Sequence, residues 1–434
     1  MFCGTEAQIL VMRHEDCILF PLKFLTRKQA NCTNFWIMSS SPAELKTEWK
    51  SVNKTWGHPF HPMCSYMAMF PPGIPHYFIE KFTKRGDAVL DPFSGRGTTA
   101  TQACADGRIG IGTDLNPLAY FLTIAKVDPP TLDETLKRIA NLEAQQTAQN
   151  IENEPEKIQA IFHHQTLSQL VFLKQKLDKK NRTDRFIIAS ILGIIHGKMK
   201  AKMTDSNYLS VDMPNTFSMS PNYIKKYIAE KNLPLLPIDV FEKLRWKVDR
   251  LFRDGAPQKK GFASLCDIRD LPEQNIPAIQ KKTIKLVVSS PPYLKVIKYG
   301  LYNWIRLWFL DIPQETVDKT LDDAHKIKPY LDFMEMASRQ VFDVLCNDGV
   351  CVWVIGDVQQ NGEENIKLAE LVWKRLEQTT DFRLIQILED PIANHKKVTK
   401  IWGKSKRGQA TKIDRLLVMS KWKKPKISVN SVAW

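Results

Sequence analysis

Residues 86–114 carry the sequence GDAVLDPFSGRGTTATQACADGRIGIGTD. The pattern predicts a short apolar strand, a glycine-rich turn, a helix of small residues that ends at Gly107, and a second strand at 108–114. A further helix is expected from Asn116-Pro117. Because a strand–loop–helix–strand order opens a doubly wound parallel sheet, the predicted fold class is α/β.

The alternation of strands and helices stops at Pro129-Pro130 and resumes near residue 261. Residues 129–260 are polar and helix-forming, and they predict a mostly helical insertion. Beyond the insertion, the expected strands are 262–267, 284–290, 350–357 and a hairpin-like pair at 382–390 and 414–422, and the expected helices are 299–310, 332–346 and 363–378.

The first 37 residues show no clear periodicity and lead into no recognisable element. Met38 then opens MSSSPAELKTEW, where Ser-Pro followed by Glu predicts a helix start. We therefore expect translation to begin at Met38, with residues 1–37 as a misassigned extension or a loosely packed tail. The expected domains are 1–37, 38–128, the insertion at 129–260, and 261–434.

The amino-acid composition limits the classes of protein to which this chain can belong. The 434 residues are 43% hydrophobic and 25% charged, which is enough apolar material for a sizeable core. The net charge of +15 favours a polyanionic partner. The longest apolar run, residues 186–195, is about half of a bilayer crossing. The eight cysteines form no C-x-x-C pair, so we expect a soluble, cytoplasmic protein with reduced thiols, no metal site and no membrane contact.

The glycine-rich turn and the acid after the second strand form the first candidate site. Gly95 and Gly97 let the backbone turn tightly and approach a ligand, and the helix start offers free N–H groups. Asp114 is suited to accept both hydroxyls of a ribose, although it could instead cap the helix that begins at Asn116. Only one helix separates the two features, so both should lie at the strand ends. Together they predict a nucleoside-containing cofactor.

The second candidate site is SSPPY at residues 289–293, directly after an apolar strand. Two prolines cannot continue a central strand, so the chain leaves the sheet at the edge where α/β proteins bind ligands. A planar ligand with an NH₂ group would fit there. The Ser290 hydroxyl and nearby carbonyls would accept its hydrogens, and the Tyr293 ring would stack on its face. The alternative is a proline-rich turn with a core tyrosine.

The basic residues concentrate near the end of the chain. Twelve Lys and Arg and a single acid, Asp414, lie between Lys396 and Lys426. The loop expected between the last two strands places Trp402 among lysines, which suits phosphate and stacking contacts, and a solvated surface loop is the alternative. The candidate nucleic-acid contacts are Lys295, Lys298, Lys397, Lys404, Lys406 and Arg407.

The motifs DPFSGRGTT, TDLNP and SSPPY, in this order, resemble the S-adenosylmethionine-dependent DNA amino-methyltransferases, especially the N4-cytosine branch with its S-P-P-Y signature. The resemblance covers about residues 57–128 and 262–422. The upstream segment HPFHPMCSYMAMFPPGIPHYFIEKF is similar to the family's cofactor-pocket motif, which precedes the glycine loop in some circularly permuted members. The resemblance implies a class I, Rossmann-like methyltransferase sheet that carries the helical insertion.

The same resemblance implies roles by position. The segment before the glycine loop would close the cofactor pocket, the loop would line its methionine side, and two acids would hold the ribose and the adenine amine. The implied cofactor residues are Phe70 and Pro71 for closure, Asp91, Phe93, Gly95, Gly97 and Thr98 for the loop, and Asp114 and Asp267 for the nucleoside. The implied catalytic residues are Ser290, Pro291, Pro292 and Tyr293. Arg96 stands where a small residue is more usual, and it receives no role.

The implied activity is methyl transfer to the exocyclic N4 of cytosine in double-stranded DNA, within a restriction–modification or related defence system. A cognate restriction endonuclease or defence protein would then be a partner. The insertion is the candidate target-recognition subdomain. Three alternatives stay open: N6-adenine methylation of DNA, N2-guanine methylation of RNA, and a non-catalytic nucleic-acid-binding module.

Overall fold

A computed structural model describes residues 8–13, 16–21, 44–53, 56–67, 69–199, 206–292, 298–320, 326–358, 366–392, 413–422, 427–428 and 432–434. The chain divides into two units, residues 1–44 and 45–434, which are described separately.

The first unit contains an antiparallel hairpin of β1 (Gln8–Arg13) and β2 (Asp16–Pro21), with Arg13 opposite Asp16. This hairpin was not predicted from the sequence. Two short apolar runs, ILVM and CILF, lie only a few residues apart in the sequence, and such paired runs are typical of a hairpin.

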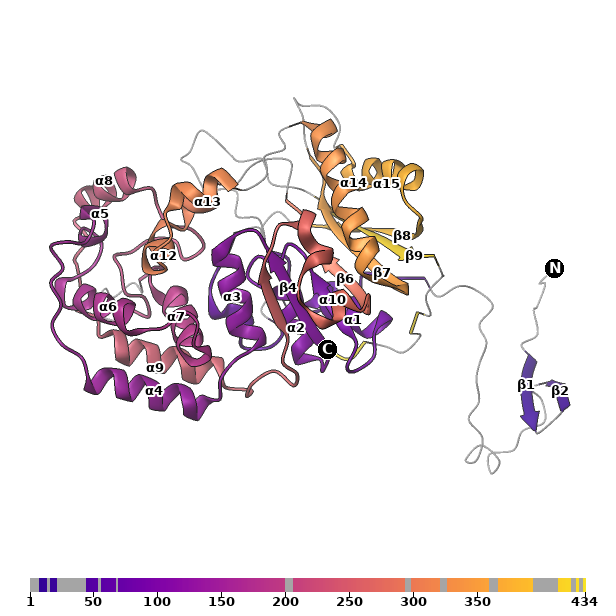
Figure 1. The fold of residues 1–434 in the computed structure, drawn as a ribbon, viewed down its shortest axis with the longest axis horizontal. Coiled ribbons are helices and arrows are strands. Elements are labelled where there is room, and N and C mark those ends of the chain that lie inside the picture. The colour runs from indigo at the N-terminus through magenta and orange to yellow at the C-terminus, as the bar shows by residue number, and fades with distance from the viewer. Residues whose placement is uncertain are drawn as a thin grey trace. The chain divides into compact units, whose positions relative to one another are not determined.

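The second unit is built on a sheet whose described strands follow the order β5-β4-β3-β6-β7-β9-β8 (Figure 1). The strands are β3 (Ala88–Asp91), β4 (Ile109–Asp114), β5 (Phe262–Leu265), β6 (Ile284–Ser289), β7 (Leu345–Gly356), β8 (Phe382–Pro391) and β9 (Ile413–Lys421). Strands β3 to β7 run parallel, and β9 is antiparallel to both β7 and β8. The strand order reverses between β3 and β6, which is where open α/β sheets bind their ligands.

Helices cover both faces of this sheet. Val288 and Val352 pack with α1 on one face, whereas their neighbours Val287 and Trp353 pack with α14 on the other, as the two-residue period of a strand requires. The helical segments outside the insertion are η2 (Glu48–Ser51), η3 (His61–Met63), α1 (Gly73–Phe82), α2 (Thr98–Ala105), α3 (Pro117–Val127), η4 (Ile268–Glu273), α10 (Pro277–Gln280), α11 (Tyr299–Tyr302), α12 (Trp304–Phe309), α13 (Gln314–Thr320), α14 (Ile327–Val344) and α15 (Leu368–Thr379). The predicted doubly wound α/β class is confirmed.

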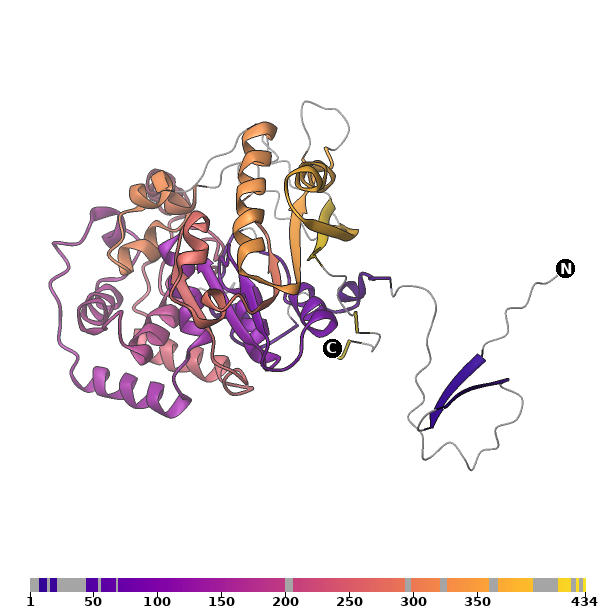
Figure 2. The ribbon, with the colours of Figure 1, turned by 45° about the vertical axis from the view of Figure 1, so that its right-hand side comes forward.

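The insertion at 129–260 is helical, as predicted, and lies to the left of the sheet in both views (Figure 1, Figure 2). Its helices are α4 (Leu132–Ala144), α5 (Glu156–Gln159), α6 (His164–Lys176), α7 (Arg182–Ile194), α8 (Pro221–Lys231) and α9 (Val240–Leu251). Its apolar core also contains Trp304 and Phe309 of α12 and Phe60, which lie outside 129–260 in the sequence.

The buried Arg306 of α12 adds polar contacts between that helix and the insertion. Its guanidinium donates to the Leu192 carbonyl at 3.2 Å, to the Asn215 carbonyl at 2.7 Å and to Asn303 Oδ1 at 2.7 Å. The insertion and α12 therefore form one packing unit.

Several expected element bounds are wrong. The helix expected at 299–310 is two short helices, α11 and α12. The helix expected at 332–346 ends at Val344, because Leu345 pairs with Ile284 and begins β7. The helix expected after Met38 is not found among residues 44–47, and only the 3₁₀ segment η2 follows.

None of the described helices combines the length and the apolar character that a membrane span requires. The cysteines whose side chains are described, Cys64, Cys104, Cys266, Cys346 and Cys351, are free thiols.

Candidate functional site

The glycine loop lies between β3 and α2 and is shaped by two glycines with positive φ. Gly95 has φ +50° and Gly97, which precedes α2, has φ +77°. A Cβ at Gly97 would lie 2.7 Å from Thr123 Oγ1 of α3, so both the backbone conformation and the space require glycine. The loop is thereby pressed against α3, which follows the next strand.

The Asp114 carboxylate lies at the end of β4 and connects the glycine loop to the start of α3. Its Oδ2 accepts a hydrogen bond from Gly95 N at 2.8 Å, and its Oδ1 accepts one from Asn116 N at 2.8 Å. The alternative that Asp114 caps α3 is wrong, because Asn116 does so by accepting from Leu118 N. Burial raises the pKa of Asp114 to about 6, against the opposing effect of these N–H groups. The carboxylate is therefore mostly ionised at neutral pH.

Asp267 follows β5, the strand beside β4. Leu265 is in register with Asp114, and Cys266 N donates to the Asp114 carbonyl at 3.0 Å. The two predicted nucleoside-binding acids therefore end neighbouring strands. In the structure Asp267 caps η4 and pairs with Arg269 at 2.6 Å.

Asp91 joins the glycine loop to the SSPP segment. Its Oδ1 accepts from Ser289 Oγ of β6 at 2.5 Å and from Phe93 N at 3.2 Å. The side chain is 1% exposed, and its Oδ2 has no hydrogen-bond partner. Burial raises the pKa of Asp91 to about 7, although the hydrogen bonds from Ser289 and Phe93 act in the opposite direction. A ligand that offers a cation or an N–H group would satisfy the free oxygen.

The segment predicted to grip the target begins where expected. Ser290 is half-buried, Pro291 is buried and Pro292 is exposed, directly after β6. Lys298 is exposed just before α11. Tyr293, Lys295, Lys397, Lys404, Lys406 and Arg407 lie outside the described residues.

The four remaining residues that were predicted to bind the cofactor contact different parts of the fold. Thr98 begins α2 and accepts from Arg96 Nε at 3.4 Å. The Phe93 ring packs against Phe333 and Trp353, at centroid distances of 5.8 and 6.1 Å, on the face covered by α14.

Phe70 packs on the opposite face, with the cluster around α1. The Pro71 carbonyl accepts from Ile74 N at the start of that helix. Within the described part of the chain, both residues therefore make their contacts with α1 and its surroundings, and the structure does not join them to Asp114 or to the glycine loop.

Tyr66, which sequence reasoning missed, contacts the residues next to Asp114 and Gly95. Its Oη accepts from Asn116 Nδ2 at 2.8 Å, and its ring lies 3.6 Å from where a Cβ on Gly95 would be. The side chain is 5% exposed. The only signal in the sequence was its position within the upstream segment that resembles a cofactor-pocket motif.

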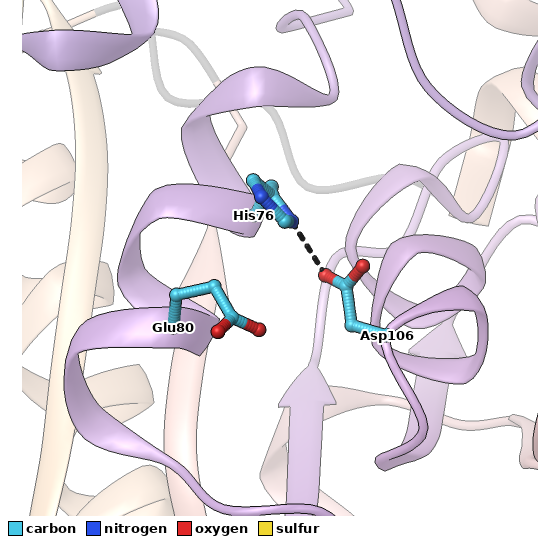
Figure 3. Close-up of side chains that lie close together, drawn as sticks. All are labelled: His76, Glu80 and Asp106. Atoms are coloured by element: carbon cyan, nitrogen blue, oxygen red, sulfur yellow. Dashed lines mark hydrogen bonds and ion pairs between the residues drawn. The ribbon is translucent and has the colours of Figure 1, made fainter. Parts of the chain in front are cut away.

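A cluster of His76, Glu80 and Asp106 lies between α1 and the end of α2 (Figure 3). His76 Nδ1 lies 2.8 Å from Asp106 Oδ2, and His76 Nε2 lies 2.6 Å from the Ala433 carbonyl. Glu80 accepts from Arg108 at 2.7 Å. Because both neighbours of the imidazole are acceptors, both of its nitrogens must donate, and the cluster is an ion pair that holds α1, α2 and residue 433 together.

The sheet order, the glycine loop after the central β3, the acid that ends β4 and the acid that follows β5 together define a class I, Rossmann-like methyltransferase fold. Residues 11–127 match the sequence model of the N6/N4 DNA methylase family. This match supports the predicted resemblance to the DNA amino-methyltransferase family.

Type II methyltransferases are among the relatives that this chain resembles in sequence. Type II beta methyltransferase M.BslI from Bacillus sp. (strain NEB-606) is 33% identical over 93 residues, which cover 18% of this chain and 10% of that protein. Type II methyltransferase M.BsoBI from Geobacillus stearothermophilus is 22% identical over 300 residues, which cover 63% of this chain and 58% of that protein. The chain thus spans less than two thirds of the length of these curated relatives.

Among solved structures, a putative DNA modification methylase from Thermus thermophilus, in complex with S-adenosyl-L-methionine, matches 37% of this chain and 54% of its own. The sequence identity is 20% and the TM-score is 0.22.

Proposed function

We propose that this protein binds S-adenosylmethionine and transfers its methyl group to the exocyclic N4 of cytosine in double-stranded DNA. The observation that carries the proposal is the hydrogen bond between Ser289 Oγ and Asp91 Oδ1. It fixes the start of the SSPP segment against the strand that leads into the glycine loop. A group bound over that loop would therefore lie beside Ser290.

The residues present fit this cofactor. Asp114 offers a carboxylate to the ribose hydroxyls, and Gly95 and Gly97 leave the loop without side chains that would block a close approach. The unpartnered Oδ2 of Asp91 suits the cationic methionine end. When bound, S-adenosylmethionine supplies an electrophilic methyl group.

The protein's own residues would act on the amine. The lone pair of an aromatic amine is delocalised into the ring, so the amine is a poor nucleophile. Acceptance of its hydrogens by Ser290 Oγ and the Pro291 carbonyl favours the pyramidal geometry in which the lone pair attacks. The base must be flipped out of the duplex to reach this place.

Serine before Pro-Pro favours cytosine over adenine, and N6-adenine methylation is the alternative that uses the same machinery. The matches to type II methyltransferases support a place in a restriction–modification system, with a cognate endonuclease as partner. We assign recognition of the DNA sequence to the helical insertion.

Nucleoside mass spectrometry on plasmid DNA from a methylase-deficient host that expresses this chain tests the proposal. N4-methylcytosine is the expected product. Ser290→Ala is the matched control, which should leave the DNA unmodified while cofactor binding stays close to that of the wild type.

Two other outcomes are informative. N6-methyladenine would correct the base and keep the mechanism. Unmodified DNA from a soluble, cofactor-binding wild-type protein would refute DNA methylation by this chain and favour an RNA substrate or a non-catalytic binding module.

A further inference from the structure

Tyr66 is in contact with the residues on which cofactor binding is proposed to depend. Its Oη accepts from Asn116 Nδ2 at 2.8 Å, and the backbone N of Asn116 donates to Asp114 Oδ1 at 2.8 Å. The Asp114 Oδ2 in turn holds Gly95 N. Burial raises the pKa of Tyr66 well above its usual value, so the phenol stays neutral over the working pH range. A short, buried path thus connects this ring to the ribose acid.

The ring of Tyr66 also stacks on Tyr299, at a centroid distance of 5.5 Å and an interplanar angle of 23°. Tyr299 begins α11, the first described helix after the SSPP segment. That helix is held by Asp318 of α13, whose carboxylate accepts from Gly300 N at 2.8 Å and from Leu301 N at 3.0 Å. The partner ring of Tyr66 therefore belongs to an anchored helix that follows the SSPP segment in the sequence.

We propose that Tyr66 is a positioning residue that couples occupancy of the cofactor site to the placement of the target-base segment. The inference rests on the proposed function, since it assumes that Asp114 holds the cofactor and that Ser290 holds the base. A ligand on Asp114 restricts Asn116, Asn116 fixes the Tyr66 hydroxyl, and the Tyr66 ring fixes Tyr299. Because such coupling is reciprocal, the cofactor and the DNA should tighten each other's binding by the same factor.

The test measures this coupling factor with sinefungin, a non-reactive cofactor analogue, and with unmodified plasmid DNA. The dissociation constant of sinefungin is determined with and without DNA. In the wild type, DNA should tighten sinefungin binding several-fold. Tyr299→Leu removes the ring stack and should reduce the coupling factor by about two- to tenfold, with sinefungin binding in the absence of DNA unchanged within about twofold.

Tyr66→Phe keeps the stack and removes the hydroxyl, so it should weaken both sinefungin binding without DNA and the coupling. The double variant Tyr66→Phe/Tyr299→Leu should lose no more coupling than the more affected single variant, because both changes interrupt one path. Tyr299→Phe, which retains a ring, should restore the coupling.

Phe342→Leu is the matched control. Phe342 of α14 packs edge-on against Phe382 of β8, at a centroid distance of 5.0 Å and an interplanar angle of 89°, away from the path, so this variant should change neither quantity. Thermal unfolding of each variant identifies any general loss of stability, which would affect both binding constants and not the coupling alone.

Three results would overturn the role of Tyr66: no coupling in the wild type, full coupling in Tyr299→Leu, or additive losses in the double variant. A wild-type protein that binds neither sinefungin nor DNA would instead refute the proposed function.

Discussion

The Asp114 side chain has two tasks at once. Its carboxylate accepts backbone N–H groups from both the glycine loop and the start of α3, and the same group is the proposed acceptor for the ribose hydroxyls. Since only the ionised form offers all of its lone pairs, the protonation state of Asp114 should contribute to cofactor affinity, together with that of Asp91.

Cofactor affinity should therefore fall as the pH is lowered through about 6, the raised pKa of Asp114. Above that pH the acceptor is charged, and below it the acid is neutral and a weaker acceptor. Calorimetric titration with S-adenosylmethionine between pH 5 and pH 8 measures the effect. Asp114→Asn should weaken binding at pH 8 by about ten- to hundredfold and remove the part of the fall that lies near pH 6.

Asp133→Asn provides the control for that titration. Asp133 is an exposed carboxylate on α4 that pairs with Lys137, and its loss should leave both the affinity and its pH dependence unchanged. A profile in Asp114→Asn that still falls near pH 6 would assign the titration to another group.

The residues at the strand ends were predictable because their chemistry and their spacing agreed. One helix separates Gly95 from Asp114, and parallel strands end at the same edge, so their contact followed from the sequence. Tyr66 was not predictable in this way. It lies in an irregular segment with no periodicity, and its place depends on packing against Tyr299, which is more than 200 residues away in the chain.

At the scale of secondary-structure elements, the turn between β3 and α2 requires glycine at position 97. Gly97→Ala should destabilise the protein by about 2–5 kcal/mol, because it combines a left-handed backbone with a Cβ that would lie 2.7 Å from Thr123 Oγ1. Urea unfolding measures the change.

Gly255→Ala is a matched control with the same φ of +77° and no atom within 4 Å of the added Cβ. It should cost only the backbone strain, about 1–2 kcal/mol. Equal losses at Gly97 and Gly255 would show that the contact with α3 adds nothing.

The ends of helices and strands were harder to predict where the local sequence pattern and tertiary contacts favour different structures. Residues 345–346 continue the apolar pattern of α14, yet Leu345 pairs with Ile284 and becomes part of β7. The expected single helix at 299–310 is interrupted at Asn303, whose side chain accepts from Arg306 Nη1 and donates to the Tyr299 carbonyl. Tertiary pairing decided both cases, and a pattern within one segment does not contain that information.

For the molecule as a whole, the His76 cluster links three distant parts of the chain. Burial alone would lower the pKa of His76, but the hydrogen bond and charge of Asp106, the Ala433 carbonyl and the charge of Glu80 together raise it above 6.5. The folded state therefore binds the proton more tightly than the unfolded state. The stabilisation that protonated His76 gives to the folded state is complete below pH 6.5. It is lost as the pH rises through the pKa that His76 has in the folded state.

His76→Gln should consequently cost about 1–3 kcal/mol at pH 6 and less at pH 9. Urea unfolding at the two pH values gives the difference. Fluorescence should report the same change, because Trp56 and Trp434 both pack against the His76 ring. His164→Gln, at an exposed histidine, is the control, and an equal cost of His76→Gln at both pH values would contradict the assignment.

The excess of positive charge should appear in the salt dependence of DNA binding. Substitution of Lys404, Lys406 and Arg407 by Ala should weaken binding at low salt. It should also flatten the plot of log affinity against log salt by about 0.9 for each phosphate that is no longer neutralised. Filter binding between 50 and 200 mM salt measures the slope. An unchanged slope would remove these residues from the interface.

Because the insertion and α12 share one apolar core, the two segments would have to be exchanged together when this protein is recombined with a relative. Trp304 and Phe309 are encoded after the SSPP segment but pack among the helices of 129–260, and Arg306 bonds to carbonyls there. A chimaera that exchanged residues 129–260 alone would place these side chains against a foreign surface. If the insertion recognises the DNA sequence, as proposed, transfer of specificity from a relative would therefore require a two-segment graft, with the insertion and the helices after the SSPP segment exchanged together.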